Sequence, residues 1–448
     1  MSKTIAQINE KIKNRTVTVV RADEMVDLVK ELGPEIAAER VDVVTTGTFG
    51  AMCSSGVFFN FGHANPPIRM SRVWLNDVEA YSGVAAVDAY LGATQASESR
   101  GIEYGGAQVI EDLLRRRKVE LRGVSDGTDC YPRKEVMAEI TLEGLNQAIM
   151  CNPRNAYQCY HAAINTSKTT KYTYMGKLKP ECRNISYSGA GELSPLNNDP
   201  EFKTIGIGTR IFIGGNRGYI TGNGTQHDPT NGFATLMVQG DLKGMSHEYV
   251  RAASLTNYGC SLYMGIGVPI PVLNSEIALK TSIADEDICT TLLDYGNSGN
   301  NKPVLKKVTY AELKSGMVEL RGKQIKTASL SSQSMALKIA EELKVWIQER
   351  DFTLTEPVEN LSRVGNIKPL IPVDSHATPK PIRNSSDNSP TGNEKWLKDL
   401  CIGCGFCTAI CPHDVFGMGI DKQIHVNPDN CRRCGDCADI CPVQAINH

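Results

Sequence analysis

The stretch CIGCGFCTAICP at residues 401–412 is followed, 30 positions later, by CRRCGDCADICP at residues 431–442. Both copies read Cys-x-x-Cys-x-x-Cys-x-x-x-Cys-Pro, which is the spacing by which bacterial ferredoxins bind iron–sulfur clusters. Three thiolates close together on a tight loop hold three corners of a 4Fe–4S cubane, and the last cysteine of the other copy holds the fourth. The pair therefore predicts a small α+β domain with two 4Fe–4S clusters.

This crossed arrangement divides the motif cysteines into two ligand sets. One set is Cys401, Cys404, Cys407 and Cys441, and the other is Cys431, Cys434, Cys437 and Cys411. A zinc ribbon pairs one Cys-x-x-Cys with another and leaves the third cysteine and the Cys-Pro unexplained. A disulfide framework suits secreted chains, whereas this chain begins MSKTIAQINEKIKNRT, without the apolar segment of a signal peptide.

Length and composition narrow the class of protein. The 448 residues are 41% hydrophobic and 22% charged, which suits a large globular core in more than one domain. The formal net charge of −2 provides no polybasic surface for nucleic acid, and no run of about 18 apolar residues is present to span a bilayer. Fifteen cysteines without an export signal indicate a reducing environment. We therefore expect a cytoplasmic protein of an anaerobe that binds neither nucleic acid nor a membrane.

Composition along the chain indicates three parts. Residues 1–360 alternate strand-like and helix-like patterns, as in a mixed α/β domain, which we expect to be the catalytic domain. Residues 361–395 are rich in proline, serine and asparagine and poor in large apolar side chains, as in a linker. Residues 396–448 then form a C-terminal α+β ferredoxin domain of the bacterial two-cluster type.

Apolar periodicity predicts individual elements within the α/β domain. Ile5, Ile8 and Ile12 lie on one helical face behind Thr4, a good N-cap. Further helices are expected at residues 23–32, 107–117 and 332–350, and strands at residues 16–20, 41–46, 72–75 and 119–124. Active sites in α/β folds gather beyond the carboxyl ends of strands, so the segments that follow these strands are the first candidates for a site.

The glycine-rich segment IGIGTRIFIGGNRGYITGNGTQHDP at residues 205–229 lacks the common nucleotide-binding signatures. It contains neither a complete Gly-x-Gly-x-x-Gly after a strand nor a Gly-x-x-x-x-Gly-Lys loop. Tight turns and backbone nests for a carboxylate both remain open for this segment.

Seven cysteines lie outside the ferredoxin motifs, and two of them follow a predicted strand and a glycine turn. Cys53 precedes Ser54-Ser55-Gly56 and is expected to head a turn or a helix, where backbone N–H groups would favour a thiolate. Cys130 is followed by Arg133 and Lys134, whose positive charges would do the same. The other five are interpreted as small buried hydrophobes: Cys151, Cys159, Cys182, Cys260 and Cys289.

Six motifs occur in order through the large domain: GTFGAMCSSG (47–56), LNDVEAYSG (75–83), DGTDCYPRKE (126–135), NPRNAYQ (152–158), YSGAGELSPLNNDP (187–200) and GTRIFIGG…GTQHDP (208–229). Together they resemble the homocysteine biosynthesis family, which includes L-aspartate semialdehyde sulfurtransferases of methanogens and other anaerobes. The resemblance implies an enzyme that converts aspartate semialdehyde to homocysteine with sulfide-level sulfur and a ferredoxin-type reductant. It also implies two catalytic cysteines, which by motif are Cys53 and Cys130. In many relatives the ferredoxin is a separate protein with an additional ligand-binding-like domain, whereas here it is fused directly.

The implied conversion turns an aldehyde into a thiol, which requires adding sulfur, losing water and adding two electrons. Two 4Fe–4S clusters supply one electron each, a persulfide on one cysteine is a good sulfur nucleophile, and a second cysteine can resolve the resulting disulfide. We expect Cys53, the favoured sulfur carrier, and Cys130 to approach each other in a cleft of the large domain, either directly or through a loop that brings them together. The reverse order of roles stays open.

Arg210 and Arg133 are candidates to bind the substrate carboxylate, because a guanidinium matches it with two hydrogen bonds. His227 and His63 are candidates for substrate contact as acid or base. Structural ion pairs and hydrogen bonds are the alternative roles of these four residues.

The expected partners are the aldehyde substrate, sulfide or a persulfide donor, and a low-potential electron donor. Whether the chain forms a homo-oligomer stays open. Two other functions also fit the motifs: an electron-transfer subunit whose large domain docks a redox partner, and a different ferredoxin-linked oxidoreductase with a cofactor on the glycine-rich segment.

Overall fold

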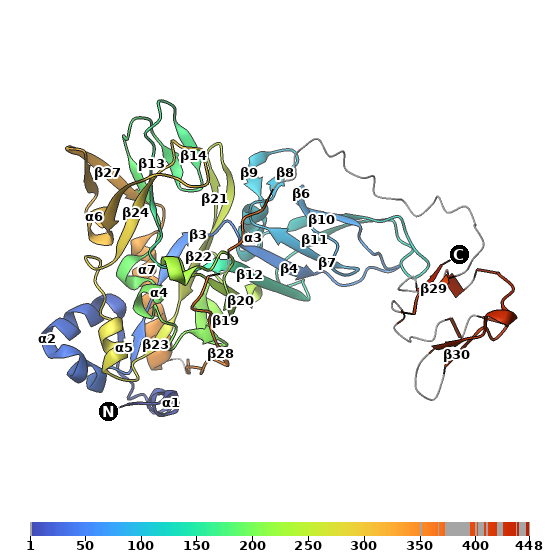
Figure 1. Ribbon diagram of the computed structural model, residues 1–448, viewed down its shortest axis with the longest axis horizontal. Coiled ribbons are helices and arrows are strands. Elements are labelled where there is room, and N and C mark those ends of the chain that lie inside the picture. Colours follow the sequence, from blue (N-terminus) through green and yellow to red (C-terminus); the bar gives the residue numbers. More distant parts are fainter. Residues whose placement is uncertain are drawn as a thin grey trace. The chain divides into compact units, whose positions relative to one another are not determined.

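A computed structural model describes residues 2–349, 352–365, 367–371, 395–398, 401, 407–408, 411–418, 424–435, 437–438 and 445–447. The chain divides into two compact units, Met1–Pro369 and Leu370–His448. The first unit combines several β-sheets with helices that pack beside them (Figure 1), so the predicted mixed α/β fold is confirmed. None of the helices in this described part of the chain has the length and apolar character that crossing a membrane requires.

A nine-stranded antiparallel sheet is the largest layer of the first unit. Its strands follow the order β21-β22-β18-β19-β20-β12-β4-β7, and β3 pairs with β22 beside this path. In chain order they are β3 (Thr48–Ala51), β4 (Gly56–Asn60), β7 (Asp88–Gly92), β12 (Gln147–Asn155), β18 (Arg210–Ile213), β19 (Asn216–Asn223), β20 (Leu236–Asp241), β21 (Val250–Leu255) and β22 (Gly259–Gly267). The consecutive strands β3 and β4 therefore pair with different neighbours, and residues 52–55 join them.

Two six-stranded sheets accompany the central one. The first has the order β11 (Glu135–Ile140), β10 (Val119–Val124), β5 (Arg72–Leu75), β6 (Val78–Ala80), β8 (Ala96–Ser97) and β9 (Gly101–Gly105). The second has the order β25 (Val304–Thr309), β24 (Cys289–Asp294), β13 (Ala162–Ile164), β16 (Ile185–Tyr187), β27 (Lys323–Ser329) and β26 (Met317–Leu320). The predicted strands at residues 72–75 and 119–124 agree with β5 and β10.

Smaller sheets complete the strands of the first unit. β1 (Val19–Arg21) runs parallel to β2 (Val43–Thr45), which pairs antiparallel with β23 (Pro269–Pro271). The remaining pairs are the hairpin β14 (Lys171–Thr173) with β15 (Gly176–Leu178), and β17 (Gly206–Ile207) with β28 (Glu359–Asn360).

The helices begin and end where the sequence provides caps and breaks. They are α1 (Ile5–Lys13), α2 (Ala22–Arg40), α3 (Gly106–Leu114), α4 (Pro195–Asn198), α5 (Ser275–Lys280), α6 (Tyr310–Lys314) and α7 (Gln333–Glu349). Thr4 and Gln7 form a capping box at the start of α1, whose isoleucines are buried as predicted. In α2 the expected break is present, because Gly33 adopts a left-handed φ of 77° before Pro34.

Helix α7 supports the strand that leads to the site described below. Its Ile339 and Leu343 are buried in a cluster with Phe49 of β3, and Met335 and Trp346 pack against the same cluster. The backbone N–H of Ser332 donates to the carbonyl of Phe49 at 2.9 Å. The contact is so close that a Cβ on Gly47 would lie 2.1 Å from the Ala336 carbonyl oxygen. The predicted apolar face of α7 is therefore confirmed.

The glycine-rich segment at residues 205–229 forms a hairpin with tight turns. Strands β18 and β19 pair antiparallel, and the turn between them places Gly214 and Gly215 at φ angles of 59° and 88°. Only glycine adopts such angles without strain. The sequence left tight turns and carboxylate-binding backbone nests open for this segment, and the described backbone matches the tight turns.

The second unit contains two short antiparallel pairs. β29 (Lys395–Trp396) pairs with β32 (Ile446–Asn447), and β30 (Phe416–Met418) pairs with β31 (Ile424–Val426). A small buried cluster joins Cys407, Val415, Phe416, Ile424 and Ile446. Both copies of the cysteine motif thus contribute to one small core.

We expect the first unit to fold without the second. A chain that ends at Pro369 keeps every sheet of the first unit and its buried clusters, and should therefore unfold cooperatively. Circular dichroism during thermal unfolding measures this, with the full-length chain as the control. A shortened chain that is insoluble, or that melts without a cooperative transition, would contradict the division.

Candidate active site

Cys53 occupies a tight turn between β3 and β4, as the sequence predicts. The backbone N–H and the hydroxyl of Ser55 both donate to the Met52 carbonyl, at 3.1 and 2.8 Å. The turn is tied to the sheet on two sides, because Met52 donates to the Leu262 carbonyl at 2.7 Å and the Asn152 amide donates to the Ser55 hydroxyl at 2.9 Å. These hydrogen bonds fix the backbone that carries the thiol.

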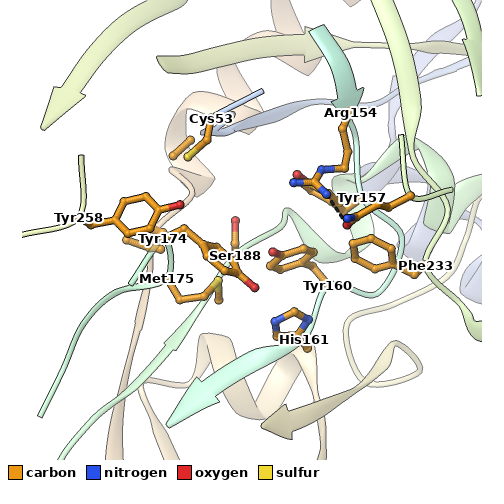
Figure 2. Close-up of a pocket in the computed structure, with 13 residues that line it drawn as sticks. Cys53, Arg154, Tyr157, Tyr160, His161, Tyr174, Met175, Ser188, Phe233 and Tyr258 are labelled. Atoms are coloured by element: carbon orange, nitrogen blue, oxygen red, sulfur yellow. Dashed lines mark hydrogen bonds between the residues drawn. The ribbon is translucent and has the colours of Figure 1, made fainter. Parts of the chain in front are cut away.

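The Cys53 side chain faces a cavity of about 490 Å³. This volume is in the range of small-molecule sites. The lining combines residues of β3 and β12 with residues of loops beside several sheets: Ala51, Cys53, Arg154, Tyr157, Tyr160, His161, Tyr174, Met175, Ser188, Gln226, Phe233, Tyr258 and Leu330. Figure 2 shows Cys53 and Tyr258 on one side of the cavity, with Arg154 across from Cys53 and His161 below.

Hydroxyl groups surround the Cys53 sulfur. Its Sγ lies 3.1 Å from the Ser261 Oγ. Burial, and then the nearby Cys53 thiol, raise the pKa of Tyr258 to about 12. Burial also raises the pKa of Tyr263, again with Cys53 as a neighbour. Tyr258 therefore remains protonated at neutral pH and can donate to an anionic sulfur, whereas the Tyr263 hydroxyl donates to the Leu330 carbonyl at 2.9 Å.

Arg154 brings a positive charge into the cavity through an irregularity in its strand. The register of β12 against β20 shifts between Asn152 and Asn155, which is a β-bulge, and bulges commonly redirect a side chain next to an active site. The backbone N–H of Arg154 donates to the Asn152 side-chain oxygen at 3.0 Å, and one guanidinium nitrogen donates to Gln226.

The guanidinium of Arg154 retains an unused donor. Its Nε is buried and has no hydrogen-bond partner within the described protein. A buried donor without a partner is costly, so the position favours a ligand that brings an acceptor. A carboxylate matches a guanidinium best, with two parallel hydrogen bonds.

Aromatic rings form a further part of the lining. Tyr157, Tyr160 and Phe233 have ring centroids 4.5 to 5.5 Å apart. His161 accepts or donates one hydrogen bond with the Tyr295 hydroxyl at 2.7 Å, and that hydroxyl also bonds the Tyr174 hydroxyl at 2.6 Å. No Asp, Glu or Lys is among the described residues that line this cavity.

Burial keeps His161 uncharged. Loss of solvent, followed by the nearby positive charge of Lys302, lowers the pKa of His161 to about 4. At neutral pH the imidazole is therefore neutral, and Arg154 supplies the fixed positive charge of the lining.

Cys130 is not among the described residues that line the cavity of Cys53, so the predicted approach of the two thiols would require its loop to move. Cys130 is exposed on the loop between β10 and β11. The Tyr131 ring stacks on His63 with centroids 6.0 Å apart, and Arg133 donates to the Pro66 carbonyl. This loop is therefore anchored beyond the carboxyl end of β4, whereas Cys53 precedes its amino end. The five residues of β4 alone span about 13 Å.

The other predicted substrate-binding residues also lie away from the cavity lining. Arg133 and His63 belong to the anchored loop contacts just described. Arg210 donates to the Thr353 hydroxyl at 2.8 Å, and its buried Nε, like that of Arg154, has no hydrogen-bond partner among the described residues. His227 is buried between the carbonyls of Thr235 and Ser362, each at 2.8 Å. These contacts fit the structural roles that the sequence left as alternatives, and neither residue lines the cavity of Cys53.

Sequence reasoning assigned no role to most of the residues that line the cavity. Arg154 and Tyr157 belong to the NPRNAYQ motif, Ser188 to YSGAGELSPLNNDP and Gln226 to GTQHDP, so the motifs contained the signal. An arginine inside a strand pattern is ordinarily a surface residue. The bulge that redirects Arg154 depends on pairing with a distant strand and is not visible in the local pattern.

Cysteines from both copies of the ferredoxin motif meet in the second unit. Cys411 lines the same small pocket as Cys431, Cys434 and Cys437. The backbone N–H of Arg433 donates to the Cys431 sulfur at 3.4 Å, a contact typical of thiolates that bind clusters. This donor set fits one 4Fe–4S cluster. In the other predicted set, Cys404 and Cys441 lie outside the described residues.

Comparison with known proteins identifies relatives for both units. Residues 17–354 match the family described as homocysteine biosynthesis enzyme, sulfur-incorporation, and residues 400–445 match the 4Fe-4S dicluster domain. The L-aspartate semialdehyde sulfurtransferase of Methanosarcina acetivorans is 58% identical over 370 residues, which cover 83% of this chain and 74% of the relative. The protein of that name from Methanocaldococcus jannaschii is 55% identical over 383 residues, covering 82% and 75%. No solved structure has significant similarity to the chain.

The position of Arg154 predicts that anionic reagents reach Cys53 preferentially. Iodoacetate carries a carboxylate and iodoacetamide is its neutral analogue. The ratio of their alkylation rates at a cysteine therefore measures how strongly a nearby guanidinium attracts the anionic reagent. Arg154→Gln should lower this ratio at Cys53 by about tenfold, because a charge-assisted hydrogen bond is worth ~1.5 kcal/mol. Mass spectrometry of the alkylated peptides measures the rates.

Cys289 on β24 is exposed, so its interpretation as a small buried residue was wrong. It is the internal control for that experiment, because it lies outside the cavity. The ratio of the iodoacetate rate to the iodoacetamide rate at Cys289 should be the same in the wild type and in Arg154→Gln. An unchanged ratio at Cys53 would show that Arg154 does not bind anions there.

Proposed function

The chain belongs to the homocysteine biosynthesis enzyme family, and from this premise we propose that it is an L-aspartate semialdehyde sulfurtransferase that forms L-homocysteine by reductive sulfur transfer. One observation carries the proposal: a single cavity holds the Cys53 thiol opposite a guanidinium with an unused donor. The same chain carries its own 4Fe–4S domain. We place the reaction in the reducing cytoplasm of an anaerobe.

The functional groups of the substrate match the lining of the cavity. Aspartate semialdehyde has a carboxylate and an ammonium at one end and an aldehyde at the other. Arg154 would bind the carboxylate, and the faces of Tyr157, Tyr160 and Phe233 would receive the ammonium by cation–π contact. The aldehyde carbon would then lie toward Cys53, across the cavity from Arg154 (Figure 2).

The overall reaction balances with sulfide as the sulfur source. Aldehyde, hydrogen sulfide, two electrons and two protons give the thiol and one water. With a persulfide on Cys53 instead, the terminal sulfur attacks the aldehyde carbon and leaves a disulfide between Cys53 and the product sulfur. A thiol from a second cysteine then releases the product sulfur, forms a disulfide with Cys53 and so supplies two further electrons.

Cys130 is retained as the second catalytic cysteine of the proposal. Because a disulfide requires Cα atoms about 4.4–6.8 Å apart, its loop would have to move toward the cavity for direct exchange. Its exposure also suits exchange with an external sulfur donor. The two routes differ in whether Cys53 and Cys130 ever form a disulfide with each other.

The second unit would supply the electrons. We propose two 4Fe–4S clusters, one on Cys401, Cys404, Cys407 and Cys441 and the other on Cys431, Cys434, Cys437 and Cys411, and the pocket that joins Cys411 to the second motif supports the crossed assignment. When bound, such clusters transfer single electrons at low potential, so a low-potential donor outside the chain would recharge them.

The decisive experiment measures homocysteine formation by the anaerobically purified full-length protein. Aspartate semialdehyde, sulfide and a low-potential reductant should give homocysteine, and Cys53→Ser should abolish it, because serine carries no transferable sulfur. Cys289→Ser is the matched control and should retain wild-type turnover, since Cys289 lies outside the cavity. No homocysteine from the wild type would refute the proposed activity.

The variant Cys130→Ser tests whether Cys130 takes part in either route. If Cys130 resolves the disulfide or receives sulfur from an external donor, turnover with a persulfide donor should fail while turnover with sulfide persists. A Cys53–Cys130 disulfide found by mass spectrometry in the wild type would then distinguish direct exchange from exchange with the donor. Normal turnover with both sulfur sources would remove Cys130 from the mechanism.

The crossed ligand sets predict where cluster damage appears. The wild-type protein should contain about eight irons and eight acid-labile sulfides. Cys411→Ser should damage the cluster anchored by Cys431, because both line one pocket. Electron paramagnetic resonance of the reduced variant distinguishes this outcome from damage to the cluster of Cys401, the neighbour in sequence. Stoichiometric zinc without a brown chromophore would contradict the ferredoxin assignment.

A further inference from the structure

The proposed reaction needs an acid inside the cavity. The aldehyde oxygen leaves as water, so it must gain two protons during each turnover. Water is a weak acid for this step, and the described lining of the cavity offers no carboxyl group and no lysine. His161 is neutral at physiological pH. The remaining proton donors of suitable type are tyrosine hydroxyls.

One of these tyrosines is connected to a buried hydrogen-bonded chain. Tyr174 lies in the turn of the β14–β15 hairpin, and its hydroxyl bonds the Tyr295 hydroxyl at 2.6 Å. Tyr295 is 7% exposed and bonds Nε2 of His161 at 2.7 Å. Tyr174 and His161 line the cavity, whereas Tyr295 joins them from behind the lining.

The other tyrosines of the cavity lie against groups with different roles. The Tyr157 hydroxyl contacts Arg154, and the Tyr258 hydroxyl lies beside the Cys53 thiol. Both positions suit the binding of an anion or of an anionic sulfur. Tyr160 stacks on His161, and its hydroxyl contacts Tyr174. Tyr174 is the cavity tyrosine that bonds directly to the Tyr295 hydroxyl, which joins it to the histidine.

We propose that Tyr174 is a catalytic acid that protonates the aldehyde oxygen, and that Tyr295 and His161 return a proton to it. The inference rests on the proposed function, because it assigns a further residue to that reaction. As the sulfur–carbon bond forms, the π bond of the carbonyl breaks and its oxygen takes the Tyr174 proton. Tyr295 donates its proton to Tyr174, and Nε2 of His161 donates to Tyr295.

His161 remains neutral in this exchange. Its Nδ1 takes a proton from water as Nε2 releases one, so the imidazole changes tautomer without gaining charge. The groups around it do not oppose this: Tyr160 stacks on its ring at 4.5 Å, Tyr295 bonds Nε2, and Lys302 disfavours the imidazolium. Burial and the neighbouring Tyr174 raise the pKa of Tyr295 above its usual value, so its hydroxyl passes protons without ionising.

The test compares Tyr174→Phe with Tyr172→Phe in the full-length holoenzyme. Both changes remove one hydroxyl from the same hairpin, and Tyr172 lies outside the cavity. Tyr174→Phe should lower kcat by about 100-fold or more, the usual effect of losing general acid catalysis. Its KM should stay close to that of the wild type, because Arg154 still binds the carboxylate. Tyr172→Phe should leave both constants unchanged.

Tyr295→Phe tests the relay without altering the cavity lining. If Tyr295 passes protons to Tyr174, Tyr295→Phe should lower kcat less than Tyr174→Phe does. The solvent isotope effect, measured against deuterium content, should change from the curve of several transferred protons in the wild type to that of a single proton in the variant. A purely structural role would lower thermal stability and leave the isotope effect as in the wild type, which would overturn the relay. Wild-type kcat in Tyr174→Phe would overturn the acid role while leaving the proposed function intact. A wild-type enzyme that forms no homocysteine would overturn both.

Discussion

The side-chain amide of Asn152 holds the two reactive groups of the cavity in register. Its nitrogen donates to Ser55, which closes the turn of Cys53, and its oxygen accepts from the backbone of Arg154. Asn152 is fully buried, so each lost hydrogen bond would leave a buried polar group without a partner, at a cost of about 1–3 kcal/mol. One amide therefore fixes a thiol on one loop and a guanidinium on a bulged strand. The geometry of the cavity depends on this joint more than on any single lining residue.

Local sequence patterns predicted the elements well because their causes are local. Strands 72–75 and 119–124 and the apolar face of α7 follow from alternation or helical spacing within a few residues. The turn at Cys53 was predictable for the same reason. Arg154 was missed, because its orientation comes from the bulge of β12 against β20, whose partner residues lie more than 80 positions away. A pattern read along one strand contains no information on such a shift.

The predicted approach of Cys53 and Cys130 rested on an α/β sheet in which the carboxyl ends of strands share one edge. In the structure β3 and β10, the strands that precede these cysteines, belong to two different antiparallel sheets. Cys53 also precedes β4, whereas the loop of Cys130 is tied to residues that follow β4. Direct exchange between the two thiols would therefore require the loop of Cys130 to move. The ferredoxin motifs are easier to interpret from sequence, because the spacing of the cysteines alone predicts the ligand sets. Cys411 accordingly lines a pocket with the cysteines of the second motif.

The charged groups that line the cavity suit the proposed reaction. A carboxylate near the sulfur would repel an anionic nucleophile, and the described lining contains none. A lysine would form a Schiff base with an aldehyde and trap it, and it too is absent from this lining. Arginine binds the substrate carboxylate without either effect, since its guanidinium stays protonated and is a poor nucleophile. What remains for acid catalysis is a neutral donor, and a tyrosine recharged through a neutral histidine meets that requirement without adding a charge beside the sulfur.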